Sequence, residues 1–211
     1  MTTFKKGKRH EQREKNQTRK NTQETGKEEE VKNTGIRLFT VGHSNRSFEE
    51  FLALLKECGI RALADIRRFP GSRTFPHFNR DTLRSSLAPQ GIEYAWFENL
   101  GGFRHSKKNE TSLNVGLETP GFRSYADYML TPQFHTAVQE LLSLAARLPT
   151  AIMCAERFFW KCHRRILCDF LVAHDVSVIH IIEPNTAKPH SLTAGATIRD
   201  DGSVIYPSPA L

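Results

Sequence analysis

Residues Ala151–Ile166 read Ala-Ile-Met-Cys-Ala-Glu-Arg-Phe-Phe-Trp-Lys-Cys-His-Arg-Arg-Ile. A short apolar run leads to Cys154 and Glu156, three aromatic residues follow, and the basic stretch 161–165 opens a helical pattern. Basic side chains in a first helical turn oppose the positive end of the helix macrodipole, so we expect an anion near them. With the apolar run Val176–Ile182, this segment predicts a strand, a helix and a second strand.

On both sides of this segment, short apolar runs alternate with helical patterns. Ser47 and Glu50 form a capping box at the start of one helix, and Thr131-Pro132 opens another. The alternation predicts an α/β fold with a mainly parallel sheet flanked by helices, and Asp201-Gly202 predicts a C-terminal β-hairpin. The expected strands are 36–41, 61–66, 92–97, 150–153 and 176–182, and the expected helices begin at residues 47, 81, 131 and 161.

Residues 1–35 differ in composition from the rest of the chain. They contain ten Lys and Arg and six Glu, a net +4 of the chain's +7, and are almost all polar. Such a segment cannot bury enough apolar surface to offset its ordering entropy. We therefore expect a disordered basic tail at 1–35 and a single α/β domain at 36–211. The tail is either merely solvated or attracts nucleic acid by neutralising phosphates.

Composition also narrows the class of protein. No apolar run approaches the roughly 18 residues of a membrane span, so we expect no membrane partner. No apolar core follows the basic start, so a secretory signal is not expected. Four cysteines in 211 residues do not form a disulfide framework. We expect a cytoplasmic protein with reduced thiols, and the oligomeric state stays open.

Polar residues gather at the ends of the expected strands. His43, Asp65, Arg67, Cys154 and Glu156 all end or follow an apolar run. Parallel sheets bind ligands beyond the carboxyl ends of their strands. These residues therefore predict a single polar site at one edge of the sheet.

A series of short motifs runs through the domain. They are Thr40-Val-Gly-His-Ser44, Ala64-Asp-Ile-Arg67, Phe69-Pro70, Ser72-Arg73, Leu100-Gly-Gly102, Tyr125-Ala-Asp-Tyr-Met129, Met153-Cys-Ala-Glu156 and Cys162-His-Arg164. This ordered series resembles the bacterial and archaeal family catalogued as the domain of unknown function 488. The resemblance spans Leu38–Tyr206 and implies no activity, because none is established for that family.

A second likeness concerns the cysteine segment alone. A strand that ends in Cys154, followed by a loop and a helix, is similar to the active-site segment of rhodaneses and cysteine phosphatases. Asp65 and Arg67 also look similar to a strand end of rhodanese domains. Trp160 stands six residues after Cys154, where the phosphatases place the arginine that binds phosphate. We therefore do not expect phosphatase chemistry by that mechanism.

The cysteines have chemical and structural interpretations. Cys154 is a candidate catalytic nucleophile if the neighbouring helix start lowers its pKa, and is otherwise a small buried hydrophobe. Cys162 is either a redox partner of Cys154 or a packing residue. Cys58 and Cys168 fall on apolar helical stripes, so we expect both in the core.

The charged residues beside the cysteines leave similar alternatives. Glu156 is a candidate general acid or base, or else the counter-ion of Arg164. His163 either activates a thiol and binds an anion or is solvated at the helix start. Arg164 is the favoured anion ligand, because its planar guanidinium suits phosphate and carboxylate.

The other two strand ends add four candidates. Asp65, as a catalytic residue, and Arg67, as an anion ligand, either face the site or pair with each other. His43 is a proton shuttle or a hydrogen-bonded core histidine. Arg73 is a further anion-binding residue or an ordinary surface residue.

The cysteine spacing predicts neither a metal nor a cofactor. The seven-residue gap between Cys154 and Cys162 is not a zinc-finger spacing, and no second cysteine pair exists.

Three functions are consistent with these features. The first is a thiol-dependent enzyme that acts on an anionic, phosphorylated substrate with Cys154 as nucleophile. The second is a nucleic-acid-associated protein, accessory to DNA repair, that contacts phosphates through the tail, the loop 104–108 and residues 67–73. The third is a redox sensor that uses Cys154 and Cys162. The stretch 100–122, which has no clear period, is a binding loop or a disordered connection.

Overall fold

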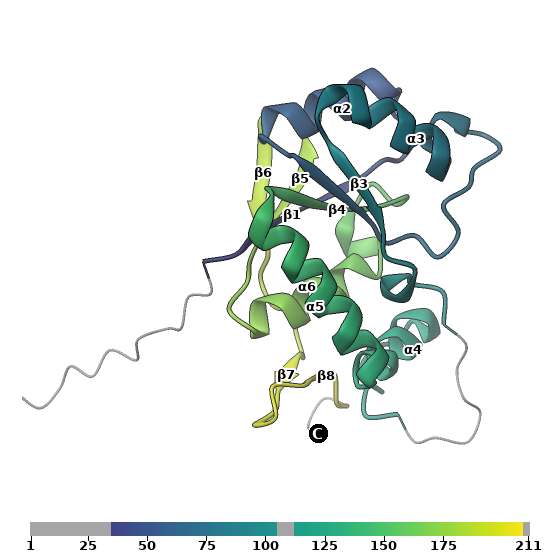
Figure 1. Cartoon of the computed structure of the whole chain (residues 1–211). Coiled ribbons are helices and arrows are strands. Elements are labelled where there is room, and N and C mark those ends of the chain that lie inside the picture. Colours follow the sequence, from purple (N-terminus) through teal and green to yellow (C-terminus); the bar gives the residue numbers. More distant parts are fainter. Residues whose placement is uncertain (1–34, 105–111, 209–211) are drawn as a thin grey trace, which may run out of the picture. The chain divides into compact units, whose positions relative to one another are not determined.

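The computed structural model describes residues 35–104 and 112–208. They contain a six-stranded sheet in the order β3-β2-β4-β1-β5-β6 (Figure 1). The strands from β3 to β5 in this order are parallel, and β6 is an antiparallel edge strand. This arrangement confirms the predicted α/β fold with a mainly parallel sheet. The strands are β1 (Arg37–Gly42), β2 (Ala62–Asp65), β3 (Glu93–Trp96), β4 (Thr150–Cys154), β5 (Ser177–Glu183) and β6 (Thr186–Pro189).

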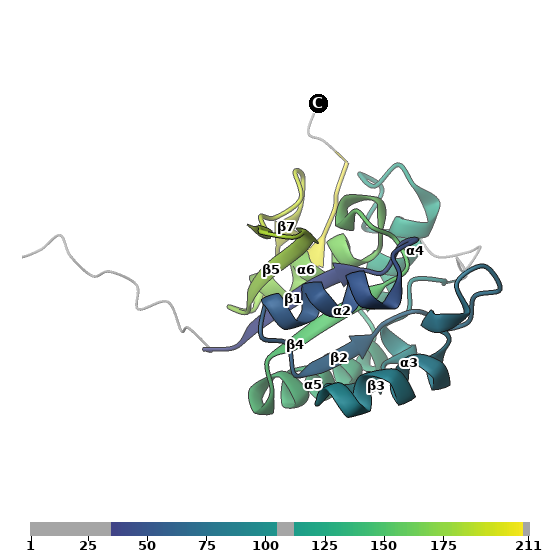
Figure 2. The same cartoon turned by 90° about the horizontal axis from the view of Figure 1, so that it is seen from above.

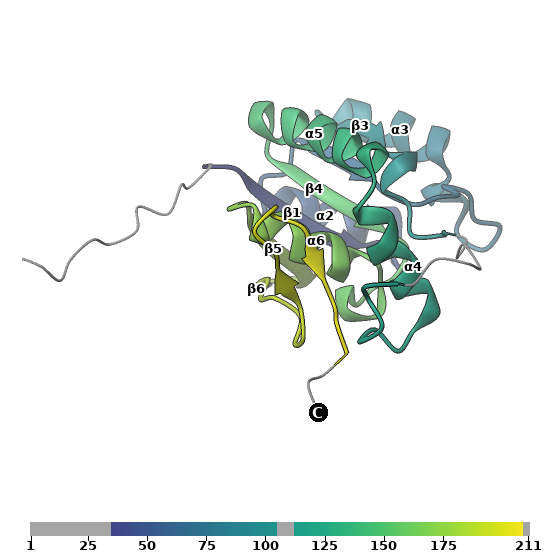
Figure 3. The ribbon, with the colours of Figure 1, turned by 90° about the horizontal axis from the view of Figure 1, so that it is seen from below.

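Helices cover both faces of this sheet. α2 and α3 pack on one face, and α4, α5 and α6 pack on the other (Figures 2 and 3). No helix in the described part of the chain is long and apolar enough to cross a membrane. The α-helices are α2 (Phe48–Glu57), α3 (Arg80–Leu87), α4 (Pro120–Met129), α5 (Pro132–Arg147) and α6 (Arg164–Ala173), and the 3-10 helices are η1 (Pro76–Phe78), η2 (Ala88–Gln90), η3 (Glu98–Leu100) and η4 (Phe159–Lys161).

Each inner strand contributes to two cores, because successive strand residues point to opposite faces. Along β4, Ile152 and Cys154 belong to the core under α4, α5 and α6, whereas Met153 belongs to the core under α2 and α3. Along β2, Leu63 faces α2 and α3, and Asp65 has the same parity. The last residues of β2 and β4 therefore lie on opposite faces of the sheet.

Two helix starts confirm the capping predictions. At α2, Ser47 Oγ accepts from Glu50 N at 3.2 Å, and Ser47 N donates to Glu50 Oε2 at 2.8 Å. At α5, Thr131 Oγ1 accepts from Phe134 N at 3.4 Å, and a proline occupies the first turn. These bonds satisfy backbone N–H groups that have no partner inside the helix.

Several elements differ from the sequence expectation. The helix expected from residue 161 begins at Arg164, after the 3-10 turn η4. Neither α4 nor β6 was expected: α4 starts in the stretch that lacks a clear period, and all four β6 residues are exposed. The predicted C-terminal hairpin is confirmed as β7 (Thr197–Ile198) paired with β8 (Val204–Ile205). The tail up to residue 34 and most of the basic loop lie outside the described residues.

The end of β1 packs against the backbone that follows β4. His43 N donates to Cys154 O at 3.0 Å, and Ser44 N donates to Ala155 O at 2.9 Å. A Cβ atom on Gly42 would lie 2.0 Å from the Glu156 carbonyl oxygen. Only glycine allows this approach, so Gly42 fixes the spacing of the two loops that carry the predicted site residues.

We predict that Gly42→Ala destabilises the protein by about 3 kcal/mol, since backbone must move to admit the methyl group. Urea unfolding measures the change. Gly121→Ala is the control, because a Cβ atom there meets nothing within 4 Å. Its free energy of unfolding should stay within about 1 kcal/mol of the parent value. Equal midpoints for the two variants would contradict the close approach at Gly42.

Candidate functional site

The predicted site residues lie at one edge of the sheet but form two separate clusters. The first, which we call the carboxylate cluster, consists of His43, Asp65, Arg67 and Tyr94 on the α2 and α3 face. The second, which we call the thiol cluster, consists of Cys154, Cys162 and His163 on the opposite face. The hydrogen bonds between the side chains of these residues stay within each cluster. The residues predicted to form one site therefore form two clusters on opposite faces of the sheet.

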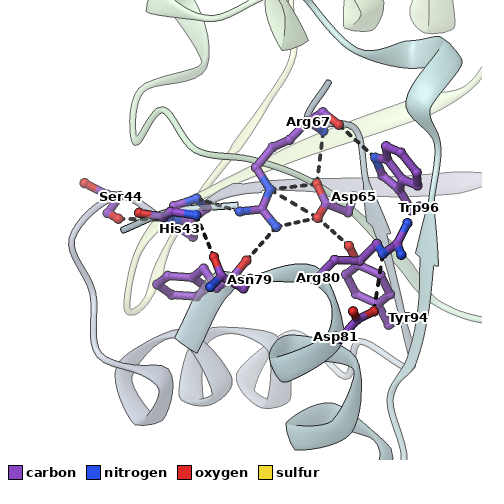
Figure 4. A network of polar contacts seen from close by, with 11 residues as sticks. His43, Ser44, Asp65, Arg67, Asn79, Arg80, Asp81, Tyr94 and Trp96 are labelled. Atoms are coloured by element: carbon purple, nitrogen blue, oxygen red, sulfur yellow. Dashed lines mark hydrogen bonds and ion pairs between the residues drawn. The ribbon is translucent and has the colours of Figure 1, made fainter. Parts of the chain in front are cut away.

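A buried ion pair forms the centre of the carboxylate cluster (Figure 4). Arg67 Nε donates to Asp65 Oδ1 at 2.9 Å, and Arg67 Nη2 donates to Asp65 Oδ2 at 2.5 Å. Tyr94 Oη also donates to Asp65 Oδ2, at 2.6 Å. Asp65 is 0% and Arg67 6% exposed, so removal of either charge would leave the other buried and unpaired. Of the two alternatives for these residues, the pairing is the one observed.

His43 is held by its neighbours as a neutral ring. Its Nε2 lies 3.3 Å from Arg67 Nη1, which can only donate, so Nδ1 carries the proton and donates to Ser44 O at 2.9 Å. The ring also stacks on Phe78 with centroids 4.2 Å apart. Burial, and next the charge of Arg67, lower the pKa of His43 to about 4. The geometry is that of a hydrogen-bonded core histidine.

A cavity of about 350 Å³ opens beside this cluster. It is lined by residues that follow the carboxyl ends of β1, β2 and β4, and the helices that follow the neighbouring strands β1 and β4 lie on opposite faces of the sheet. Ligands of open α/β sheets bind at such switch points. Arg67, a predicted anion ligand, lines the cavity, but its guanidinium is bonded to Asp65 and to Phe78 O. Arg73, the other predicted ligand in this region, is an exposed residue. The lining residues include His43, Ser44, Arg67, Phe69, Ser72 and Ala155.

The thiol cluster joins the end of β4 to the start of α6. His163 Nδ1 lies 4.0 Å from Cys154 Sγ and 3.5 Å from Cys162 Sγ. The two sulfur atoms lie within 4.8 Å of each other. Arg164 N, in the first turn of α6, donates to Cys162 Sγ at 3.4 Å. Both cysteines are buried, at 8% and 4% exposed.

The surroundings of the two thiols shift their pKa values in opposite directions. Hydrogen bonding to Cys162, and next burial, raise the pKa of Cys154 well above its ordinary value. Burial acts the same way on Cys162, but the bond from Cys154 and the neighbouring His163 and Arg164 outweigh it and lower the pKa of Cys162. Cys162 Sγ also lies closer to His163 Nδ1 than Cys154 Sγ does and accepts from Arg164 N, so these contacts favour Cys162, rather than Cys154, as the thiolate.

Arg164 is buried and bonded to backbone carbonyl groups. It is 1% exposed, and its Nη2 donates to the carbonyl oxygens of Glu156 and Arg157. The Glu156 side chain is exposed, and the bond from Arg164 reaches its backbone. Arg164 thus bonds to the Glu156 backbone and not to its carboxylate, and its role as an anion ligand stays a prediction.

The segment after η3 covers the thiol cluster. A Cβ atom on Gly102 would lie 2.3 Å from His163 Nδ1, so only glycine fits beside the ring. Tyr125 Oη donates to Leu100 O at 3.0 Å and its ring meets the His163 ring edge-on at 5.0 Å. His163 Nε2 is buried and has no hydrogen-bond partner among the described residues. His163 is half-buried, and its ring packs between Gly102, Tyr125 and the two thiols.

A family described as Domain of unknown function DUF488 matches residues 47–171. The chain belongs to this family. Its description names no activity. Searches of the curated proteins and of the solved structures found no match. The DUF488 match contains Asp65, Arg67 and the whole thiol cluster, whereas His43 precedes it.

Sequence reasoning missed a buried polar chain that lies mostly outside the DUF488 match, with only Asp169 inside it. It links Thr40, His180, His190, Asp169 and Tyr206 by hydrogen bonds of 2.6–2.9 Å. No regular spacing connects these positions. His180, which stands among the apolar residues of the strand pattern 178–182, was the available signal, because a buried polar side chain requires a partner.

We predict that His43 makes folding stability depend on pH. The folded pKa of about 4 lies below the ordinary value of 6.5, so the unfolded chain binds a proton more readily. The contribution is complete above pH 6.5 and is lost as the pH falls towards 4. Between pH 7 and 4.5, His43→Gln should lose roughly 2 kcal/mol less stability than the parent protein. Chemical unfolding at both pH values tests this, and parallel losses would disprove it.

Proposed function

We propose that this protein is a thiol redox protein in which Cys154 and Cys162 cycle between two thiols and one disulfide. The observation that carries the proposal is the thiol pair itself, with sulfur atoms within 4.8 Å and oppositely shifted pKa values. Opposite shifts are typical of groups with different roles in one reaction. Cys162 is the nucleophile and Cys154 resolves the intermediate.

The oxidant in this proposal is a peroxide. The Cys162 thiolate attacks one peroxide oxygen, the O–O bond breaks, and Cys162 becomes a sulfenic acid while the released oxygen takes a proton. Cys154 then gives up its proton and attacks the Cys162 sulfur. An S–S bond forms, and hydroxide leaves as water with that proton. Two electrons pass from the two thiols to the peroxide, and a dithiol reductant reverses the change.

Three neighbours support this chemistry. The Arg164 N–H group donates to Cys162 Sγ and stabilises negative charge on it. His163 Nδ1 lies close to both sulfur atoms and is placed to receive or return a proton. Gly102 packs against this ring and keeps it beside the sulfur atoms. A reducing cytoplasm, the proposed location, would keep the resting pair as thiols.

The other two hypotheses have less geometric support. For a phosphorylated substrate, the proposed anion ligands Arg67 and Arg164 are occupied by Asp65 and by backbone carbonyls. A small ligand could fit the cavity of about 350 Å³ beside the carboxylate cluster, so binding of a small anionic substrate stays a prediction. The nucleic-acid hypothesis depends mainly on the tail and basic loop, which lie outside the described residues, and it also stays a prediction.

We predict that peroxide joins Cys154 to Cys162 and removes two hydrogen masses from the intact protein. Peptide mapping by mass spectrometry identifies the bond. Cys154→Ser should stop at a sulfenic acid on Cys162 that dimedone traps. Cys162→Ser should form neither product and should react with peroxide at least about tenfold more slowly, because it lacks the thiolate.

Cys58→Ser is the matched control. Cys58 is a half-buried thiol whose pKa is raised by burial, so its loss should leave the oxidation rate unchanged. Circular dichroism of each variant checks folding. Unchanged oxidation in Cys162→Ser, or a disulfide that maps to other cysteines, would exclude the proposed mechanism.

A further inference from the structure

A chain of buried polar side chains crosses the core under α4, α5 and α6. Thr40 Oγ1 lies 2.7 Å from His180 Nδ1, and His180 Nε2 lies 2.9 Å from His190 Nδ1. His190 Nε2 lies 2.9 Å from Asp169 Oδ1, and Tyr206 Oη donates to Asp169 Oδ2 at 2.6 Å. The side chains of His190 and Asp169 are 1% and 0% exposed.

The acceptors in this chain determine where the ring protons lie. The carboxylate of Asp169 accepts from Tyr206 Oη and from Thr193 N, so the remaining bond at Oδ1 takes its proton from His190 Nε2. His190 Nδ1 is then a lone pair that faces His180 Nε2. His180 Nε2 and His190 Nδ1 therefore share one proton. The other nitrogen of each ring is bonded, to Thr40 in one case and to Asp169 in the other.

A thiol lies beside these two nitrogens. Cys168 Sγ, a His180 ring nitrogen and a His190 ring nitrogen lie within 4.8 Å of one another. Cys168 is 0% exposed and projects from α6, while His180 lies in β5 and His190 follows β6. One sulfur and two imidazole nitrogens are ligands that Zn²⁺ prefers.

We propose that Cys168, His180 and His190 bind a divalent cation of the zinc type. The arrangement around the rings supports this, because histidines that bind metals have a carboxylate or another group bonded to the second nitrogen. Asp169 occupies that position for His190, and Thr40 occupies it for His180. The nitrogens that would face the cation are His190 Nδ1 and His180 Nε2.

The protons balance in a simple way. Cys168 loses its thiol proton to solvent. His180 moves its ring proton from Nε2 to Nδ1, so that Thr40 Oγ1 accepts a bond instead of donating one. His190 keeps its bond to Asp169. Uptake of one cation therefore releases one proton, and the affinity should rise with pH.

The thiol cluster is the weaker of the two metal candidates. Its ligand atoms also lie within 4.8 Å, but His163 Nε2 has no hydrogen-bond partner in the described part of the chain. The proposed metal site shares no residue with the redox pair Cys154 and Cys162. Metal binding at this site can therefore be tested independently of the proposed redox function. Cys168, His180 and His190 show no metal-binding spacing in the sequence, and no second cysteine lies near Cys168 in the pattern of a zinc finger.

The test uses Co²⁺ with the full-length chain, stripped of metal by a chelator. Cys154→Ser and Cys162→Ser together provide the background, since they remove the competing thiol cluster. We expect one equivalent of Co²⁺ to give ligand-field bands and a sulfur-to-cobalt charge-transfer band. In that background, Cys168→Ser should abolish the charge-transfer band, and His190→Gln should weaken binding at least about tenfold.

A second measurement guards against variants that fold poorly. Zn²⁺ should raise the Tm of the background protein, and the rise should shrink in Asp169→Asn, which keeps all three ligands. Absence of Co²⁺ binding in the background protein would overturn the proposal. Binding that survives both Cys168→Ser and His190→Gln with full affinity would also overturn it. Peroxide oxidation of His190→Gln with Cys154 and Cys162 intact should proceed as in the parent protein.

Discussion

The guanidinium of Arg164 holds together the segment on which the thiol cluster depends. It is buried in the core, and its bonds go to the Glu156 and Arg157 carbonyl oxygens. A buried cation is costly unless strong hydrogen bonds compensate, and two carbonyl oxygens supply them at Nη2, whereas Nε has no partner among the described residues. The bonds fix the loop after β4 against the start of α6. Cys154 and Cys162, at opposite ends of that loop, are thereby brought together.

The same loop transmits this constraint to β1. The Glu156 carbonyl that accepts from Arg164 is the group that excludes a side chain at Gly42. β1 in turn carries Thr40 into the polar chain on one face and leads into His43 on the other. One buried side chain on α6 thus relates the positions of both clusters, although they lie on opposite faces of the sheet.

Much of the fold could be predicted from sequence, and the division of the site could not. Apolar runs, the capping box at Ser47 and the hairpin turn are local signals, and each reports a local structure. Both faces of inner parallel strands are buried, so no alternation of polar and apolar residues shows that Asp65 and Cys154 point to opposite sides. The planar guanidinium of Arg164 predicts an anion ligand, whereas its carbonyl partners are created only by the folded loop. The His180–His190 contact joins elements whose spacing carries no pattern.

The edge strand β6 has a consequence for how the sheet ends. Its four residues are exposed, and the strand is short and includes Lys188 and Pro189. An exposed strand edge is a template on which another chain can add a strand. Proline offers no N–H group, and the lysine charge opposes a close apolar neighbour. Growth of the sheet by intermolecular pairing is therefore disfavoured on the side where β6 lies.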